Sequence, residues 1–198
     1  MAGSAAPNEL RIAVTGHRVI VDVPRVLAGI EEALERIEAA FPGRSLIVVS
    51  ALAEGADRLV AEAVLRRPGA RLQVVLPMPR LDYFADFATP ESRDAFLHLL
   101  ARAAEVVVLP PQASRGEAYA AANDLMLADG EVLLVIWDGA GARGQGGTAE
   151  VVARARAGHM PLAWIHAGHR AAETTETTET TEPASPGVEQ AGVTFENL

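Results

Sequence analysis

The chain has 198 residues, a formal net charge of −9 and no cysteine. This length predicts one domain with a substantial core. The lack of cysteine excludes disulfides and thiolate metal sites. All 17 Lys and Arg positions hold arginine, and these arginines form no basic run. The acidic balance therefore disfavours nucleic-acid binding through a basic surface.

The N-terminal sequence MAGSAAPNEL lacks the basic flank and apolar centre of a signal peptide. No apolar stretch approaches the roughly 18 residues that cross a bilayer. We therefore expect a soluble, cytoplasmic protein without a membrane partner.

Short apolar runs rich in β-branched residues alternate with helical patterns along the chain. The first strand is predicted at Arg11–Gly16 (RIAVTG) and the first helix at Asp22–Ala40. Further strands are predicted at 45–50, 71–77, 105–110, 131–137 and 161–167. Further helices are predicted at 54–67, 89–103, 115–128 and 147–157.

These strands are continuous apolar runs, which is typical of a parallel sheet with helices on both faces. Repeated strand–helix–strand units predict an α/β fold, with a doubly wound parallel sheet in a Rossmann-like three-layer sandwich. We expect this single domain to span residues 10–167, after a flexible N-terminal segment of residues 1–9.

The composition changes at about Gly168. Residues 168–198 contain an acidic Thr/Glu repeat, ETTETTETTE, which is too polar to bury a core and predicts a disordered C-terminal tail. The final VTFENL has apolar residues with which it could dock on the domain, but chain ends are usually loose, and we expect the same here.

The strand-to-helix connections carry almost all the chemically informative side chains, whereas the helix-to-strand connections are short and rich in Gly and Pro. In an open parallel sheet the former share the carboxyl edge, where ligands bind at the point at which the strand order reverses. We therefore predict the site at this edge. The candidate ligand-binding residues are Gly16, His17, Arg18, Ser50, Gly55, Asp57, Asp138, Arg143, Gly146, Gly147 and Thr148.

The connection DGAGARGQGGTAE follows the fifth predicted strand and contains five glycines. Thr148 is expected to cap the next helix, whose remaining free N–H groups and dipole favour a bound anion. Gly146 and Gly147 allow close approach of the backbone, and Arg143 could close over the anion. We predict a phosphate-binding loop, with a flexible turn that binds nothing as the alternative.

Neither common nucleotide fingerprint is present. GARGQGG is not a G-x-G-x-x-G motif and does not follow the first strand, which disfavours a dinucleotide oxidoreductase. The chain has no lysine, which excludes an ordinary P-loop NTPase.

Three motifs in order resemble the SLOG superfamily of Rossmann-like domains: AVTGHR, SALAEGAD and GGTAE. This superfamily includes DNA-processing protein A, the LOG phosphoribohydrolases that activate cytokinins, YpsA-like proteins and ligand-sensing domains of bacterial defence systems. Ser50, Gly55 and Asp57 match the S-G-L-A-x-G-I-D pattern of DNA-processing protein A, in which a glycine stands at the position of Ala51. The TGHR sequence is similar to the T-G-Y-R of YpsA-like proteins. The resemblance covers residues 10–167.

The resemblance implies a nucleotide or nucleotide-derived ligand and, in the enzymatic branch, cleavage of an N-glycosidic bond. LOG enzymes carry P-G-G-x-G-T-x-x-E, whose glutamate takes part in catalysis, so Glu150 is the candidate catalytic residue. Glu150 lies one residue closer to the threonine than in that motif, which turns a helical side chain by about 100°. The LOG arginine motif is also absent. A glutamate in the first turn that complements the helix dipole is the alternative.

Other candidates also have two interpretations. Asp57 could bind a ribose hydroxyl or simply lie in the first turn of a helix, and the Asp138–Gly pair could be plain turn chemistry. His17 is either a ligand contact or an ordinary loop residue. The aromatic cluster DYFADF could stack on a base, but we favour its role as an anchor of the long loop to the core. The histidines show no metal-ligand spacing, so we predict no metal site and no cofactor.

We expect the chain to bind or sense a phosphate-bearing, nucleotide-like small molecule. The alternative is an enzyme that cleaves an N-glycosidic bond, such as a nucleoside monophosphate phosphoribohydrolase or a deoxyribosyltransferase-like protein. Binding of single-stranded DNA is a third hypothesis, which the net charge of −9 disfavours. Members of the superfamily often self-associate, so the resemblance also leaves room for a homo-oligomer.

Overall fold

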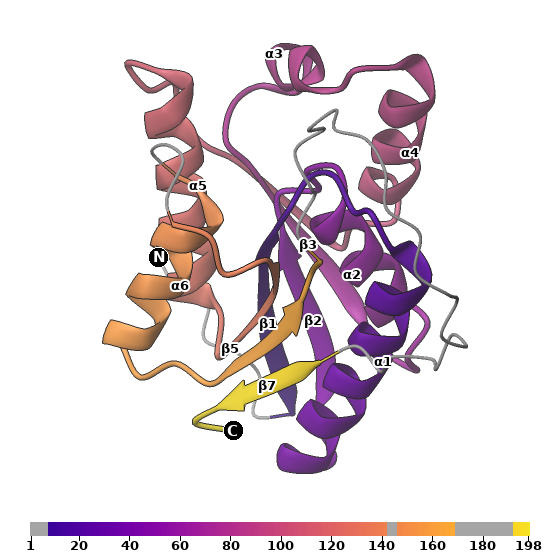
Figure 1. Cartoon of the computed structure of the whole chain (residues 1–198). Helices are drawn as coiled ribbons and strands as arrows, with labels where there is room; N and C mark the ends of the chain where they lie inside the picture. The colour runs from indigo at the N-terminus through magenta and orange to yellow at the C-terminus, as the bar shows by residue number, and fades with distance from the viewer. Residues whose placement is uncertain (1–7, 142–145, 169–191) are drawn as a thin grey trace, which may run out of the picture.

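The computed structural model describes residues 8–141, 146–168 and 192–198. They contain a seven-stranded sheet with the strand order β4-β3-β2-β1-β5-β6-β7 (Figure 1). The strands are β1 (Glu9–Gly16), β2 (Ser45–Ser50), β3 (Arg71–Leu76), β4 (Glu105–Val108), β5 (Val132–Trp137), β6 (Leu162–His166) and β7 (Val193–Glu196). The helices are α1 (Val23–Ala40), α2 (Ala56–Val64), α3 (Arg80–Tyr83), the 3-10 helix η1 (Phe84–Asp86), α4 (Pro90–Leu100), α5 (Arg115–Asp129) and α6 (Thr148–Ala157).

The six strands β1 to β6 are parallel, and helices cover both faces of the sheet. Figure 1 shows α1, α2 and α4 on one side and α5 and α6 on the other. In β1, Ile12 and Val14 pack into the core on the first side, and Ala13 packs into the core on the second. Burial on both faces explains why the strands are continuous apolar runs. The predicted α/β, doubly wound fold is confirmed.

The strand order reverses between β1 and β5. The chain proceeds outward from β1 through β2 and β3 to β4, and α5 then carries it back to the other side of β1. Gly16 at the end of β1 is paired with Ile136 near the end of β5. The helices that follow β1 and β5 leave on opposite faces, so the carboxyl ends of these two strands border a crevice.

The C-terminal strand β7 pairs antiparallel with β6, from Leu162 opposite Glu196 to Ile165 opposite Val193. It lies within the predicted tail, so the expectation of a loose chain end is wrong for Val193–Glu196. Phe195 packs against the core, and Arg156 Nε donates to a carboxylate oxygen of Glu196 at 2.9 Å. The sequence prediction missed this strand of four residues because the polar repeat dominates the composition of residues 168–198. Residues 169–191 of the predicted tail lie outside the described residues.

At the N-terminus β1 begins at Glu9, within the segment expected to be flexible, and residues 1–7 lie outside the described residues. The other helix and strand predictions differ from the structure mainly at their ends, apart from α3 and η1, which the sequence did not predict. The proposed N-terminus of α4 is confirmed, because the Thr89 hydroxyl accepts from Ser92 N at 3.2 Å and Pro90 opens the helix. Across the described residues, every helix is too short or too polar to cross a bilayer.

Candidate functional site

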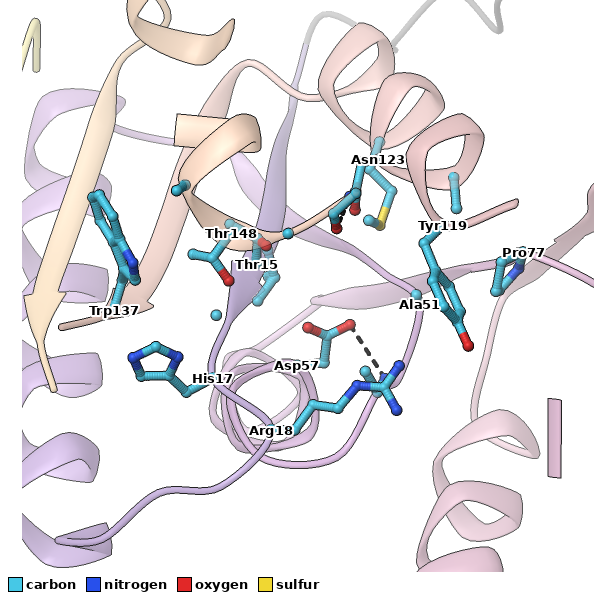
Figure 2. A pocket seen from close by; sticks show the side chains of 18 of the residues that line it. Thr15, His17, Arg18, Ala51, Asp57, Pro77, Tyr119, Asn123, Trp137 and Thr148 are labelled. Atoms are coloured by element: carbon cyan, nitrogen blue, oxygen red, sulfur yellow. Dashed lines mark hydrogen bonds between the residues drawn. The ribbon is translucent and has the colours of Figure 1, made fainter. Parts of the chain in front are cut away.

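A cavity of about 650 Å³ lies at the carboxyl ends of β1 and β5 (Figure 2). This volume falls within the range of small-molecule sites, and the position is the reversal point of the strand order. Its walls come from the ends of β1 and β5, the loop that opens α2, the first turn of α6 and one face of α5. The predicted location of the site at the carboxyl edge therefore coincides with a real cavity.

The predicted site residues fall into three groups. Those that line the cavity are Gly16, His17, Arg18, Asp57, Asp138, Gly146, Gly147 and Thr148. Ser50, Gly55 and Glu150 do not line the cavity, but each of them contacts a residue that does. Arg143 lies outside the described residues.

Asp57 places a buried carboxyl group in the cavity wall. Its Oδ2 accepts from Ser50 Oγ at 2.9 Å and from Ala53 N at 3.3 Å, and Ser50 Oγ in turn accepts from Leu52 N at 3.0 Å. Burial raises the pKa of Asp57 to about 6, although these hydrogen bonds and the nearby Arg18 oppose that shift. Asp57 is thus more than a first-turn residue: it is a cavity carboxyl that can titrate near neutral pH, held in place by Ser50.

Gly55 fixes the loop that carries Asp57. Its φ is +74°, and a Cβ at this position would lie 2.4 Å from the carbonyl oxygens of His17 and Arg18. Ala56 N donates to His17 O at 3.0 Å, which joins the start of α2 to the loop after β1. A residue without a side chain is therefore needed both for the backbone conformation and for this close approach. The contact brings Arg18 beside Asp57 at the cavity.

His17 connects the ends of β1 and β5. Asp138 N donates to His17 Nε2 at 3.1 Å, and the Asp138 carboxylate oxygen Oδ1 lies 3.1 Å from the same nitrogen. Asp138 Oδ1 also accepts from Ala140 N at 2.9 Å, as in an Asp-initiated turn. Asp138 therefore shapes the turn, as one interpretation predicted, and it also lines the cavity.

The first turn of α6 forms another wall. The helix begins at Thr148 with Gly147 as its N-cap residue, so the prediction that Thr148 caps the helix is wrong by one position. Gly147 has no side chain with which to cap the helix. Glu150 N and Val151 N donate to Gly147 O at 3.1 Å and 3.3 Å. The N–H groups of Thr148 and Ala149 lie too close to the start of the helix for a partner within it, and both residues line the cavity. This end of α6 therefore offers the cavity backbone donors and the positive end of a helix dipole.

Glu150 points back toward the turn that precedes α6. Its Oε2 accepts from Gly146 N at 2.9 Å, and it is absent from the cavity lining. Gly146 has φ +75°, and a Cβ there would lie 3.0 Å from Ala120 N of α5, so the turn packs tightly on that helix. Asn123 Nδ2 donates to Gly146 O at 2.8 Å. Glu150 and Asn123 thus hold the backbone of the predicted phosphate loop from two sides.

The α5 wall was missed by the sequence prediction. Its cavity-lining residues are Tyr119, Ala122, Asn123 and Met126. A signal in the sequence was the polar pair Asn123 and Asp124 after AYAAA, of which Asn123 lines the cavity. In Figure 2, Tyr119 and Trp137 flank the space into which Asp57 and Thr148 point.

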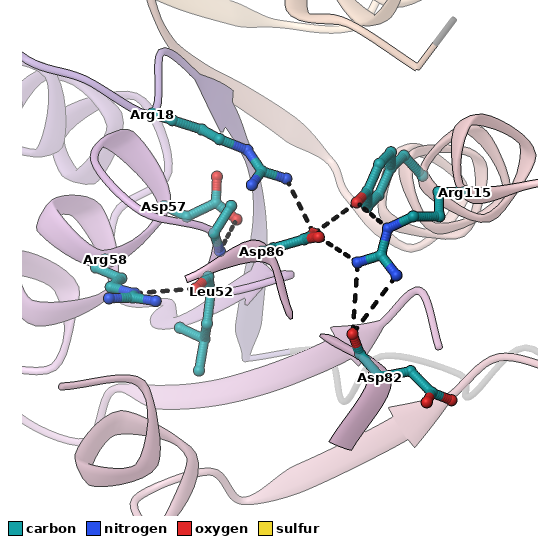
Figure 3. A network of polar contacts seen from close by, with 9 residues as sticks. Arg18, Leu52, Asp57, Arg58, Asp82, Asp86 and Arg115 are labelled. Atoms are coloured by element: carbon teal, nitrogen blue, oxygen red, sulfur yellow. Dashed lines mark hydrogen bonds and ion pairs between the residues drawn. The ribbon is translucent and has the colours of Figure 1, made fainter. Parts of the chain in front are cut away.

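Arg18 lies between the cavity and a polar network outside it (Figure 3). Its side chain is 41% exposed, its Nη2 lies 3.4 Å from Asp86 Oδ2, and its guanidinium carbon is 5.6 Å from the centre of the Tyr119 ring. Asp86 belongs to η1, in the long connection after β3. The cation that faces the cavity is therefore shared with a carboxylate from another loop.

The aromatic cluster of that connection packs into the core, as we favoured. The Tyr83 and Phe87 rings are buried, and both contact Phe96 of α4, with centroids 5.9 Å and 5.0 Å from its ring. Tyr83 also reaches the cavity wall. Burial raises the pKa of its hydroxyl, so Tyr83 stays a neutral hydrogen-bonding group.

Among the described residues, the cavity thus combines backbone donors at a helix N-terminus, one guanidinium, one imidazole, two carboxyl groups and three aromatic side chains. Such a set can bind an anion at one point, and hydroxyl groups and a flat ring at others. No protein-family model matches this chain, and no curated protein matches it.

Proposed function

We propose that this chain binds or senses a phosphate-bearing nucleotide or nucleotide-derived small molecule in the cavity between β1 and β5. The observation that carries the proposal is that the first turn of α6 and the Arg18 guanidinium face one cavity at the reversal of the strand order. Helix N-termini and arginine both favour phosphate, and this edge of a doubly wound sheet is where such ligands bind.

The other groups suit the remainder of a nucleotide. Asp57 and Asp138 can accept from ribose hydroxyls, and the Trp137 and Tyr119 rings can flank a base. The SLOG resemblance of residues 10–167 supports the same ligand class. In this proposal Glu150 stabilises the loop before α6, because its carboxylate accepts a hydrogen bond from Gly146 N and does not line the cavity.

Cleavage of an N-glycosidic bond is the second candidate. It is favoured by Asp57, a buried carboxyl group in the cavity wall whose pKa burial raises to about 6. A carboxylate beside the anomeric carbon stabilises the positive charge of the transition state. In this scheme Asp57 replaces Glu150 as the candidate catalytic residue.

The test is a thermal-shift screen against nucleoside mono-, di- and triphosphates, cyclic nucleotides and ADP-ribose, followed by chromatography of each positive mixture. A ligand at 100 times its Kd stabilises the fold by about 2.7 kcal/mol, which raises Tm by about 5–10 °C for a domain of this size. A shift with the ligand recovered intact supports a binding or sensing role. The absence of any shift across the screen, with folded protein, overturns the proposal.

Release of free base in these mixtures would instead favour the enzyme. Asp57→Asn should then keep binding and lose base release, whereas Glu150→Gln should keep both, because an amide oxygen can still accept from Gly146 N. Loss of base release in Glu150→Gln alone would return the catalytic role to Glu150.

A further inference from the structure

Asp86 collects three donors that come from two distant parts of the chain. Its carboxylate accepts from Tyr119 Oη at 2.5 Å and from Arg115 Nη2, and it lies 3.4 Å from Arg18 Nη2 (Figure 3). The side chain of Asp86 is only 8% exposed. The two guanidinium groups and the phenol thus contact a carboxylate that is almost completely buried.

The cluster offers more hydrogen-bond donors than one carboxylate needs. Two guanidinium groups and a phenol face Asp86, and Arg115 also approaches the backbone oxygen of Asp82. Arg18 also lies beside Asp57, where its charge opposes the rise in the pKa of that carboxyl group. Two arginines and a hydroxyl donor form the kind of donor set that binds a phosphate dianion, and phosphate accepts more hydrogen bonds from it than a single carboxylate can.

The cluster borders the cavity. Arg18 and Tyr119 line the cavity, whereas Asp86 and Arg115 do not. An anionic group that reached Arg18 and Tyr119 from the cavity would meet the donors that Asp86 now occupies. The neighbouring Tyr83 and Phe87 rings anchor the backbone of this segment in the core. Asp86 would therefore leave by a change of its side-chain rotamer and not by movement of the backbone.

We infer that Arg18, Arg115 and Tyr119 form a second anion subsite, which the Asp86 carboxylate fills when no ligand is present. This inference rests on the proposed function and divides its two anion-binding groups: the first phosphate lies at the start of α6, and Arg18 belongs to the second subsite. The ligand class is thereby narrowed to nucleotides with a second anionic group beyond that phosphate. Asp86 acts as an internal competitor that lowers affinity for such ligands and leaves nucleotides with one phosphate unaffected.

The experiment compares three probes by isothermal titration calorimetry: AMP, ADP and adenosine 3′,5′-bisphosphate. They are titrated into the wild-type chain, into Asp86→Asn, and into Asp82→Asn as the matched control, because the Asp82 side chain is exposed in the same connection. If Asp86 fills the subsite about nine-tenths of the time, its removal strengthens binding about tenfold. We expect that gain for ADP or the bisphosphate in Asp86→Asn, no comparable gain for AMP, and none for any probe in Asp82→Asn.

A second variant keeps the inference testable if Asp86→Asn does not fold. Arg115→Gln removes one cation of the subsite at an exposed position outside the cavity lining. It should weaken binding of the two-anion probe that binds best and leave the affinity for AMP unchanged. Equal changes for AMP and for the two-anion probes, in either variant, would overturn the subsite while leaving the proposed function intact. If no probe binds to any variant, the subsite for these ligands is overturned, and the proposed function is decided separately by the wider thermal-shift screen.

Discussion

Thr148→Pro removes one backbone donor from the candidate phosphate site and little else. Thr148 is the first residue of α6, a position at which proline is favoured because its missing N–H has no partner within the helix. Gly147 precedes it with φ −82° and ψ 164°, an extended conformation that a residue before proline readily adopts. Thr148→Ala is the matched control, because it shortens the same side chain and keeps the N–H.

The expected loss follows from one charge-assisted hydrogen bond. Such a bond to phosphate is worth about 1.5–3 kcal/mol, so Thr148→Pro should weaken binding about 10- to 150-fold. Thr148→Ala should change Kd by less than about threefold if the backbone rather than the hydroxyl holds the phosphate. The stability of Thr148→Pro should stay within about 1 kcal/mol of the wild-type value, because the native backbone already suits proline.

The assay is calorimetric titration with the nucleotide that gives the largest thermal shift, together with thermal unfolding of each variant without ligand. Unfolding curves that coincide would establish that any loss of affinity arises at the site. If Thr148→Pro folds normally and binds as tightly as the wild type, the phosphate does not lie at the start of α6. A loss in Thr148→Ala as large as that in Thr148→Pro would assign the contact to the hydroxyl instead.

Three stability measurements address the surrounding structure. Burial raises the pKa of Asp57 to about 6, above the value near 3.9 in an unfolded chain. The folded state therefore binds this proton more tightly, and stability should fall by up to about 3 kcal/mol between pH 4 and pH 6 and level off above. Asp57→Asn should remove that slope in urea titrations, and an unchanged slope would contradict the assignment. Gly55→Ala should cost about 3 kcal/mol or more and lower Tm by about 6–12 °C, whereas Gly43→Ala, also at positive φ but with open space around it, should cost only about 1 kcal/mol. Equal decreases of Tm in Gly55→Ala and Gly43→Ala would show that the close contact at Gly55 does not affect stability. Deletion of residues 192–198 removes the packing of Phe195 and should lower Tm by about 3–6 °C, for a loss of about 1.5 kcal/mol; an unchanged Tm would mean that β7 adds nothing to the fold.

The fold and the edge that carries the site were predictable because both depend on local patterns. The continuous apolar strands indicate a sheet covered on both faces, and polar residues gather after the strands rather than before them. Asp57 and the loop before α6 were therefore placed on the correct edge from the sequence alone.

The remaining features depend on strand order, which local patterns do not contain. The α5 wall exists because the chain returns from β4 to the far side of β1, which sets Tyr119 and Asn123 against the turn at Gly146. The contact between Asp86 and Arg18 likewise joins residues 68 positions apart. The roles assigned to Thr148 and Glu150 depended on which residue opens α6, and helix ends are uncertain by a residue or two in any sequence pattern.

The neighbouring positions of β1 and β5 also have a kinetic consequence. His17 and Asp138 meet across 121 residues of sequence, so the two strand ends that border the cavity come together only when a very long loop closes. Contacts of such high contact order form late during folding, after the local strand–helix–strand units. We therefore expect the cavity to form after the folding transition state, so that a bound ligand stabilises the native state alone. Such a ligand should slow unfolding of the chain and leave the rate of folding almost unchanged.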